Sequence, residues 1–229
     1  MDNVSVIIKK QLKDTLKNKT VLIQFIMFPA MTLIMENAIK IDGMPENFFT
    51  KLFSVMYIGM APLTSAAAII SEEKEKNTLR VLLMANVKPW EYLLGVSVYV
   101  WTLCMLGALV MSSGLKASDI PFYLMIMGLG FVISILIGSC VGIYARNQMV
   151  STSLVMPVMM VLSFAPMLAM FNDKIEVLAR IFFTQQIRVI FNTMSFGEAG
   201  KTGFAVIALN ACAALGLFFT AFRRNRSYN

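Results

Sequence analysis

The sequence predicts an all-α integral membrane protein that forms a single domain over residues 1–229. Hydrophobic residues make up 58% of the chain and charged residues only 14%, and the mean hydropathy is +0.71. Soluble domains carry about 25% charged residues, so this composition indicates a membrane protein. The apolar residues also fall into six long runs separated by polar segments. Because a helix needs roughly 20 apolar residues to cross a bilayer, each run predicts one membrane-spanning helix.

The first segment, residues 1–19, predicts a basic amphipathic helix. Five lysines alternate there with apolar side chains such as Val6, Ile7 and Leu12. A helix of this kind lies on an anionic inner leaflet, with its lysines among the headgroups. We do not expect a signal peptide, because the apolar run that follows is too long and does not end in a small-residue cleavage site.

The six spans are predicted at residues 20–39, 52–71, 92–112, 122–144, 149–171 and 204–222. Between the last two, the segment 172–203 mixes charged residues with spaced apolar ones. This pattern favours short interfacial or re-entrant helices over a soluble loop. The three cysteines lie inside apolar runs without paired spacing, so we expect them to pack as small apolar side chains rather than form disulfides or bind metal.

The lysines and arginines predict how the chain is oriented in the membrane. In alternate loops, 13 of them fall on one side of the predicted spans and 7 on the other. The richer side contains both termini and the loop 71–91. The positive-inside rule therefore places these three segments in the cytoplasm, at the cell membrane. This orientation signal accounts for the net charge of +7, so no nucleic-acid partner is expected.

The loop 71–91 is a long polar-to-amphipathic stretch between two strongly apolar runs. Glu72 and Lys76 are spaced to pair on one helix face and to carry the preceding span into water. Asn77 and Thr78 are favourable residues for starting a new helix. Pro89 suits the first turn of the next helix, where its missing N–H is not needed. The loop therefore predicts a helix end, a short surface helix, a turn and a helix start. Within the short helix, three leucines share one side: Leu79, Leu82 and Leu83.

The same residues resemble a known family. Residues 73–83 read Glu-Lys-Glu-Lys-Asn-Thr-Leu-Arg-Val-Leu-Leu, and residues 87–95 read Val-Lys-Pro-Trp-Glu-Tyr-Leu-Leu-Gly. They resemble the cytoplasmic loop of ABC-2 type exporter permeases, in which a coupling helix docks on a separate ATP-binding subunit. Asn77 stands where that family usually has Gly, and Arg80 where it usually has Glu. Asn tolerates similar turn geometry, whereas Arg80 changes the charge presented to the ATPase.

The resemblance implies a non-catalytic membrane subunit of an ATP-driven exporter. Residues 1–19 would be an elbow helix, and 172–203 would carry external helices. Two permease subunits, identical or different, would assemble with two ATP-binding subunits. ATP and Mg²⁺ would bind to those partners, and this chain would bind no cofactor. The predicted ATPase-docking residues are Glu72, Glu73, Glu75, Asn77, Thr78, Leu79, Arg80, Leu82 and Leu83.

A stripe of small residues recurs every four positions in the fourth predicted span: Gly130, Ser134, Gly138 and Gly142. Small residues allow another helix to approach closely. The favoured interpretation is packing within the chain, and the alternative is contact with a second permease subunit.

Several residues in the spans are candidates for a translocation pathway. Gln24 and Asn210 are polar groups within apolar runs, and Met156 and Met160 belong to a methionine-rich fifth span. Polar groups in hydrocarbon are costly and often line a pathway, although Asn210 is equally expected to bond between helices. Methionine adapts to irregular partners. Glu36 lies near the outer end of its span, where we expect it to reach the headgroups.

Other function classes fit less well. An intramembrane enzyme is disfavoured, because the chain has no histidine for a Ser–His pair or a metal site. An ion-coupled carrier or channel remains the alternative, although Glu36 gives it little support. The Gly-Lys-Thr at residues 200–202 lacks the glycine that a phosphate loop requires. For an exporter, the favoured cargo is a hydrophobic or amphipathic peptide, with drugs next.

Overall fold

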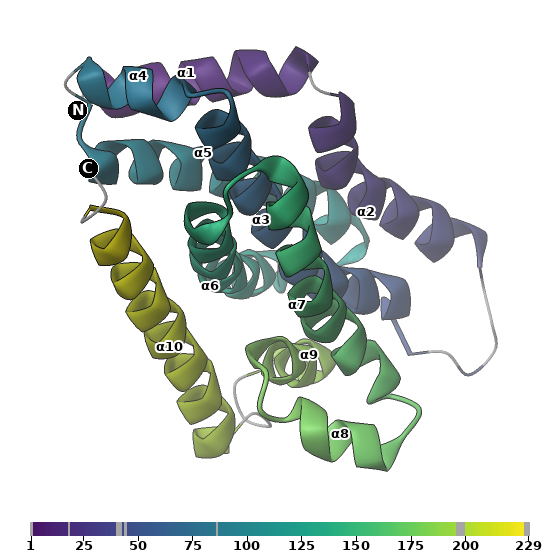
Figure 1. Cartoon of the computed structure of the whole chain (residues 1–229). Helices are drawn as coiled ribbons and strands as arrows, with labels where there is room; N and C mark the ends of the chain where they lie inside the picture. Colours follow the sequence, from purple (N-terminus) through teal and green to yellow (C-terminus); the bar gives the residue numbers. More distant parts are fainter. Residues whose placement is uncertain are drawn as a thin grey trace.

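The computed structural model describes residues 2–17, 19–39, 43, 45–85, 87–195 and 200–226. This part consists of helices joined by turns and loops and contains no strands. In chain order the elements are α1 (Asp2–Lys17), α2 (Lys19–Ala38), α3 (Phe48–Glu75), α4 (Thr78–Met84), α5 (Pro89–Met111), the 3-10 turn η1 (Ser112–Gly114), α6 (Ile120–Tyr144), α7 (Gln148–Leu168), α8 (Asp173–Ala179), α9 (Phe183–Thr193) and α10 (Gly200–Arg226) (Figure 1).

The expected all-α architecture with membrane-length apolar helices is confirmed. Among the described residues, α3, α5, α6, α7 and α10 are long and apolar enough to cross a membrane. The remaining predicted span, the first at residues 20–39, corresponds to α2, whose apolar part, Leu22–Ala38, is shorter than these five. Each predicted span therefore falls on a helix, and five of the six meet the length expected of a span.

Helix α3 is the centre of the molecule. It packs against α2, α5, α6, α7 and α9, and 83% of its most apolar stretch is buried. Tyr57 shows why. Its ring, which is fully buried, lies 5.9 Å from Phe28 of α2 and 5.6 Å from Phe131 of α6, measured between ring centroids. Such aromatic contacts stabilise the packing of three helices at one point.

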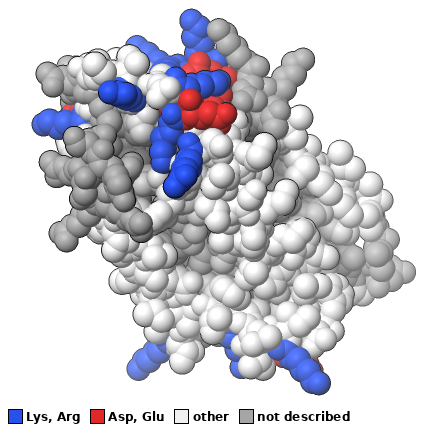
Figure 2. Space-filling model, viewed as in Figure 1, with Lys and Arg blue, Asp and Glu red and all other residues white. Residues whose placement is uncertain are grey.

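Helices α7 and α10 lie towards the outside. Only 28% of the apolar stretch of α7 and 11% of that of α10 are buried, and α10 packs mainly on α6 and α9. Figure 2 shows charged side chains gathered near the end where α1 and α4 lie and a few at the opposite end. The described residues visible between these two ends are uncharged. A broad uncharged band with charges at both ends is the surface that a lipid bilayer requires.

Helix α1 lies across the beginning of α5. Ile7, which is buried, touches the backbone at Gly95 so closely that a Cβ there would lie 2.7 Å from the Ile7 side chain. The opposite face of α1 exposes Val6, Lys9 and Lys13. The amphipathic helix predicted for residues 1–19 is thus present over Asp2–Lys17.

The segment between α7 and α10 contains two short helices, α8 and α9, as predicted for residues 172–203; residues 196–199 lie outside the described part. Helix α9 buries Phe183, Ile187, Ile190 and Phe191. It packs against α3, α6, α7 and α10, so it covers the end of the helix bundle opposite α4 (Figure 1).

Candidate functional site

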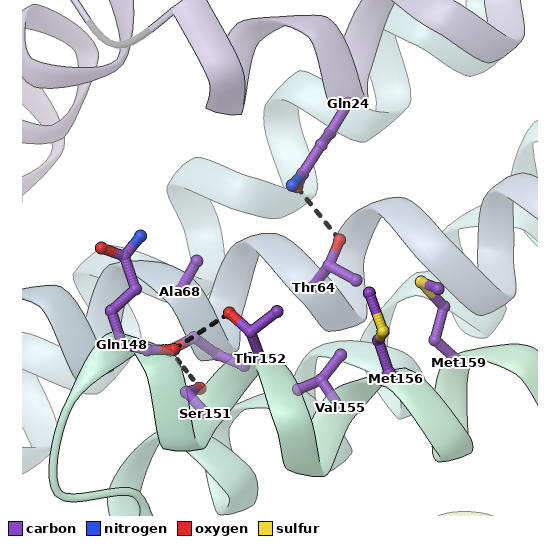
Figure 3. A pocket seen from close by; sticks show the side chains of 10 residues that line it. Gln24, Thr64, Ala68, Gln148, Ser151, Thr152, Val155, Met156 and Met159 are labelled. Carbon is purple, nitrogen blue, oxygen red and sulfur yellow. Dashed lines mark hydrogen bonds between the residues drawn. The ribbon is translucent and has the colours of Figure 1, made fainter.

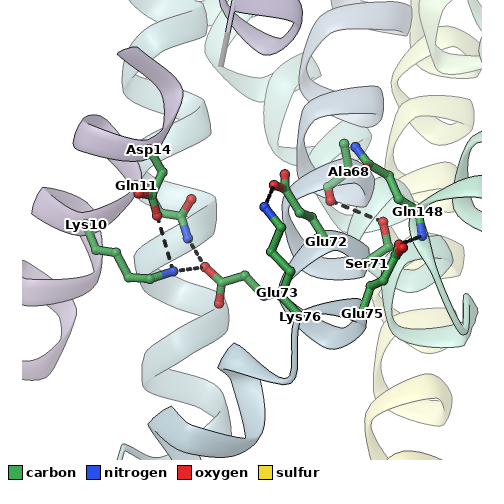
Figure 4. Close-up of polar contacts among 10 residues, drawn as sticks. All are labelled: Lys10, Gln11, Asp14, Ala68, Ser71, Glu72, Glu73, Glu75, Lys76 and Gln148. Atoms are coloured by element: carbon green, nitrogen blue, oxygen red, sulfur yellow. Dashed lines mark hydrogen bonds and ion pairs between the residues drawn. The ribbon is translucent and has the colours of Figure 1, made fainter. Parts of the chain in front are cut away.

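The last turn of α3 contacts three other helices through consecutive side chains. The carboxylate of Glu73, which is only 6% exposed, accepts hydrogen bonds from Lys10 and Gln11 of α1 (Figure 4). Lys10 also lies 3.5 Å from Asp14. A buried carboxylate needs such partners, because leaving it unpaired in an apolar environment is costly. Glu73, predicted to dock an ATPase, is therefore engaged within the chain.

The next two residues contact the turn between α6 and α7. The ammonium group of Lys74 donates to the main-chain oxygens of Ile143, at 2.5 Å, and Ala145, at 2.6 Å, where α6 ends. The carboxylate of Glu75 accepts from the main-chain N–H of Gln148, the first residue of α7, at 2.8 Å. Lys74 thus caps one helix and Glu75 caps the next.

Glu72 and Lys76 form an ion pair within their own helix (Figure 4). Their hydrogen bond raises the pKa of the Lys76 ammonium. The Lys76 side chain is exposed, so water screens this interaction and it contributes little to stability. The i,i+4 pairing predicted from the sequence is present.

The sequence predicted that the leucine side of α4 faces outward to dock an ATPase, but the structure exposes a different face. Leu79 and Leu82 are partly buried and pack against the core, and the Leu83 side chain lies outside the described residues. The exposed apolar residues are Val81, at 63%, and Met84, at 80%, beside the exposed Arg80. A short amphipathic helix turns its leucine side to its own protein. The outward face of α4 is thus Arg80, Val81 and Met84.

The connections of α4 follow the predicted turn chemistry. Asn77 adopts a left-handed backbone conformation with φ 55°, which Asn tolerates better than most residues. Its carbonyl accepts from the N–H of Val81 at 3.3 Å, so α4 follows α3 directly. Pro89 opens α5, as expected, and the main-chain N–H of Lys88 donates to the Glu91 carboxylate at 2.9 Å.

A pocket of about 460 Å³ lies between α2, α3 and α7 (Figure 3). Gln24 of α2 forms one wall, and its amide oxygen accepts from Thr64 at 3.1 Å and from Ser65 at 3.2 Å. Among the residues that the structure describes, none that lines the pocket is charged. The lining residues are Gln24, Thr64, Ala67, Ala68, Gln148, Ser151, Thr152, Val155, Met156 and Met159. The pocket therefore combines amide and hydroxyl groups with flexible thioether side chains.

The structure brings together two of the four predicted pathway residues, Gln24 and Met156. Met160 is exposed outside the pocket lining. Asn210 donates to the main-chain oxygen of Ile181 at 2.9 Å and to that of Val206 at 2.8 Å, so it ties α10 to the chain after α8. The sequence suggested a bond between helices for Asn210, whereas its partner Ile181 lies in the turn between α8 and α9.

The small-residue stripe of α6 packs on α3 within the chain. A Cβ on Gly138 would lie 2.2 Å from the main-chain oxygen of Leu63, and one on Gly142 would lie 2.9 Å from Ile70. Ser134 donates to the Ile58 carbonyl at 2.6 Å. Gly130 contacts Ile58 and Ile187 in the same way. These four positions therefore lie at an intramolecular helix–helix contact.

Sequence reasoning missed several residues of these sites. Thr64, Ser151 and Thr152 line the pocket, and Val81 and Met84 form the exposed apolar face of α4. The hydroxyl residues were visible as polar positions in the second and fifth spans. Their convergence depends on how α2, α3 and α7 pack, which no local pattern gives.

A scan against protein-family models finds no match to this chain. A search of curated proteins finds no similar sequence either.

Proposed function

We propose that this chain is the transmembrane subunit of an ATP-driven exporter of the ABC-2 type. The observation that carries the proposal is the exposed apolar face of α4. Val81 and Met84 are exposed at 63% and 80%, at the charged end of the molecule. Helix α4 continues directly from α3, which also forms a wall of the pocket. A surface helix joined to a pocket-lining helix is suited to transmit the movement of an ATPase.

In this proposal the end that carries α1 and α4 faces the cytoplasm at the cell membrane, and α2 acts as the sixth span. The exposed side of α1, with Lys9 and Lys13, lies on the anionic leaflet. Two such subunits, identical or different, assemble with two ATP-binding subunits. ATP and Mg²⁺ bind to the partners, and Arg80 beside Val81 contributes charge complementarity to the contact.

The pocket is the proposed beginning of the cargo pathway. The described part of its lining is uncharged, so a cargo with an isolated charge would be desolvated beside these residues without a partner. Amide, hydroxyl and thioether groups suit amphipathic molecules. We therefore favour hydrophobic or amphipathic peptides as cargo, with drugs next. ATPase activity of the reconstituted complex that rises with a lipid-linked sugar but not with amphipathic peptides would overturn this preference.

The test of the docking surface is a pull-down of the purified chain with the ATP-binding subunit encoded beside it. We expect wild type to bind, and Val81→Asp and Met84→Asp to lose binding, because each buries an unpaired charge in the contact. The matched control is Val177→Asp, an exposed apolar residue of α8 at the other end. Leu82 is unsuitable because it packs against the core. If wild type binds no ATPase, a carrier or channel becomes the better proposal.

A further inference from the structure

Lys74 and Glu75 are adjacent in sequence and hold the two sides of one turn. Lys74 donates to the carbonyls of Ile143 and Ala145 at the end of α6, and Glu75 accepts from the first N–H of α7, that of Gln148. Only Ala145 to Asn147 separate these helices. The last turn of α3 therefore holds the α6–α7 turn from both ends (Figure 4 shows the Glu75 contact).

The charges of the two residues have the correct signs for these positions. The end of a helix exposes unpaired carbonyls and attracts a cation, whereas the start exposes unpaired N–H groups and attracts an anion. The Lys-Glu order thus matches the order in which α6 ends and α7 begins. Asn147 also accepts from the N–H of Val150 at 2.9 Å, so the first turn of α7 is capped from within the turn and from α3.

These contacts connect α4 with the pocket. Only Lys76 and Asn77 lie between the end of α3 at Glu75 and the beginning of α4, and Asn77 makes this connection in a left-handed backbone conformation. On the other side, Gln148 is the first residue of α7, which supplies Ser151, Thr152, Val155 and Met156 to the pocket wall. A displacement of α4 that moves the end of α3 must therefore move the beginning of α7 or break the contacts of Lys74 and Glu75.

We propose that Lys74 and Glu75 are positioning residues that convert movement of α4 into movement of α7, and thereby into a change in the pocket. This inference rests on the proposed function, because it takes the ATPase as the source of the movement. The neighbouring pair Glu72–Lys76 has the same chemistry but bonds within its own helix. It provides the matched control.

The first experiment tests, in the purified full chain without a partner, whether Lys74 and Glu75 stabilise the turn between α6 and α7. Hydrogen exchange is followed in peptides that cover residues 145–151. We expect Lys74→Met and Glu75→Ala to speed exchange there about tenfold, which corresponds to the loss of one charge-assisted hydrogen bond. Glu75→Gln keeps an acceptor oxygen but loses the charge, so its exchange should lie between that of wild type and Glu75→Ala, whereas Lys76→Met should remain close to wild type. Unchanged exchange in both Lys74→Met and Glu75→Ala would overturn the inference.

The second experiment tests transmission in the complex with the ATP-binding subunit. Thr152→Cys reports on the pocket through its rate of labelling by a water-soluble maleimide, in a Cys212→Ser background, since Cys104 and Cys140 are buried. We expect a non-hydrolysable ATP analogue to change this rate at least about threefold. The change should disappear in Lys74→Met and Glu75→Ala, measured on complexes that have retained the ATPase and at a temperature at which the variants are folded. It should persist in Lys76→Met.

The outcomes separate the two proposals. If both variants bind the ATPase and keep the nucleotide-dependent change of wild type, the inference is overturned while the proposed function stands. If wild type binds no ATPase, the proposed function fails, and the transmission role fails with it whatever the exchange rates show.

Discussion

Lys10 of α1 donates to the buried carboxylate of Glu73 at the end of α3. Gln11, one residue further along α1, donates to the same carboxylate oxygen. A surface helix and the central helix are therefore joined at a carboxylate that is hardly exposed. This contact holds α1 against the last turn of α3, which leads into α4. Its contribution to stability can therefore be measured by replacing one partner at a time.

Replacement of Lys10 by Met should lower the free energy of unfolding by about 1–3 kcal/mol, because it leaves the buried Glu73 carboxylate with one partner fewer. The measurement is thermal unfolding in detergent. Glu73→Gln should be milder, since its amide oxygen still accepts, and the double variant should cost less than the sum of the two. The control is Lys13→Met, an exposed lysine of the same helix. An equal loss in this control would argue against the pairing.

Gly138 should not tolerate even a methyl group. Its Cβ would lie 2.2 Å from the main-chain oxygen of Leu63, so Gly138→Ala must push α6 away from α3. We expect a loss of about 1–3 kcal/mol, typical of overpacking. In Gly216→Ala of α10, nothing lies within 4 Å of the added atom, and the substitution should be neutral or stabilise the helix by up to about 1 kcal/mol. The measurement is the melting temperature of each variant. Equal melting temperatures for Gly138→Ala and Gly216→Ala would contradict the close contact between α6 and α3.

Glu36 should stabilise the beginning of α3. Its carboxylate accepts from the main-chain N–H of Thr50 at 2.9 Å and from the Thr50 hydroxyl at 3.2 Å. Asn47, at the cap position, makes no side-chain cap. Glu36→Ala should therefore cost about 1 kcal/mol, as the loss of a helix cap does. Glu46→Ala breaks only an exposed pair with Lys116 and should stay within about 0.5 kcal/mol of wild type. Equal unfolding midpoints for the two variants would contradict this assignment.

The pocket should be reached by water, whereas the outer side of α7 should not. Thiol reagents attack the thiolate, which forms in water and not in an apolar environment. In a Cys212→Ser background, Met156→Cys should thus react with a water-soluble maleimide about tenfold faster than Leu154→Cys. Both positions are exposed on α7, but only Met156 lines the pocket. Similar rates at the two positions would show that the pocket is closed to water in the membrane.

Helix positions could be predicted from the sequence because a run of about 20 apolar residues is the length that a helix needs to cross a bilayer. The predicted span 122–144, for example, is α6 from Ile120 to Tyr144. Local chemistry was equally informative at Pro89, which opens α5, and at Asn77, which is left-handed. Each of these features depends on one residue and its immediate neighbours.

Features that depend on tertiary packing could not be predicted. Leucine spacing identified the apolar side of α4 but not that Leu79 and Leu82 face the core. The sequence placed Glu36 near the outer end of its span but did not indicate that its carboxylate bonds to Thr50, which depends on the packing of α2 on α3. Likewise, Gln24 meets Thr64 only when α2 packs on α3. Spacing along the chain cannot supply these distances.

The successive contacts of Glu73, Lys74 and Glu75 have a consequence for how this chain can change in length. A single residue inserted in or deleted from the last turns of α3 would rotate all three side chains by about 100° around the helix axis. It would remove their bonds to α1, α6 and α7 at once. Helix ends near a surface loop usually accept insertions and deletions; this one should accept substitutions more readily than any change of register.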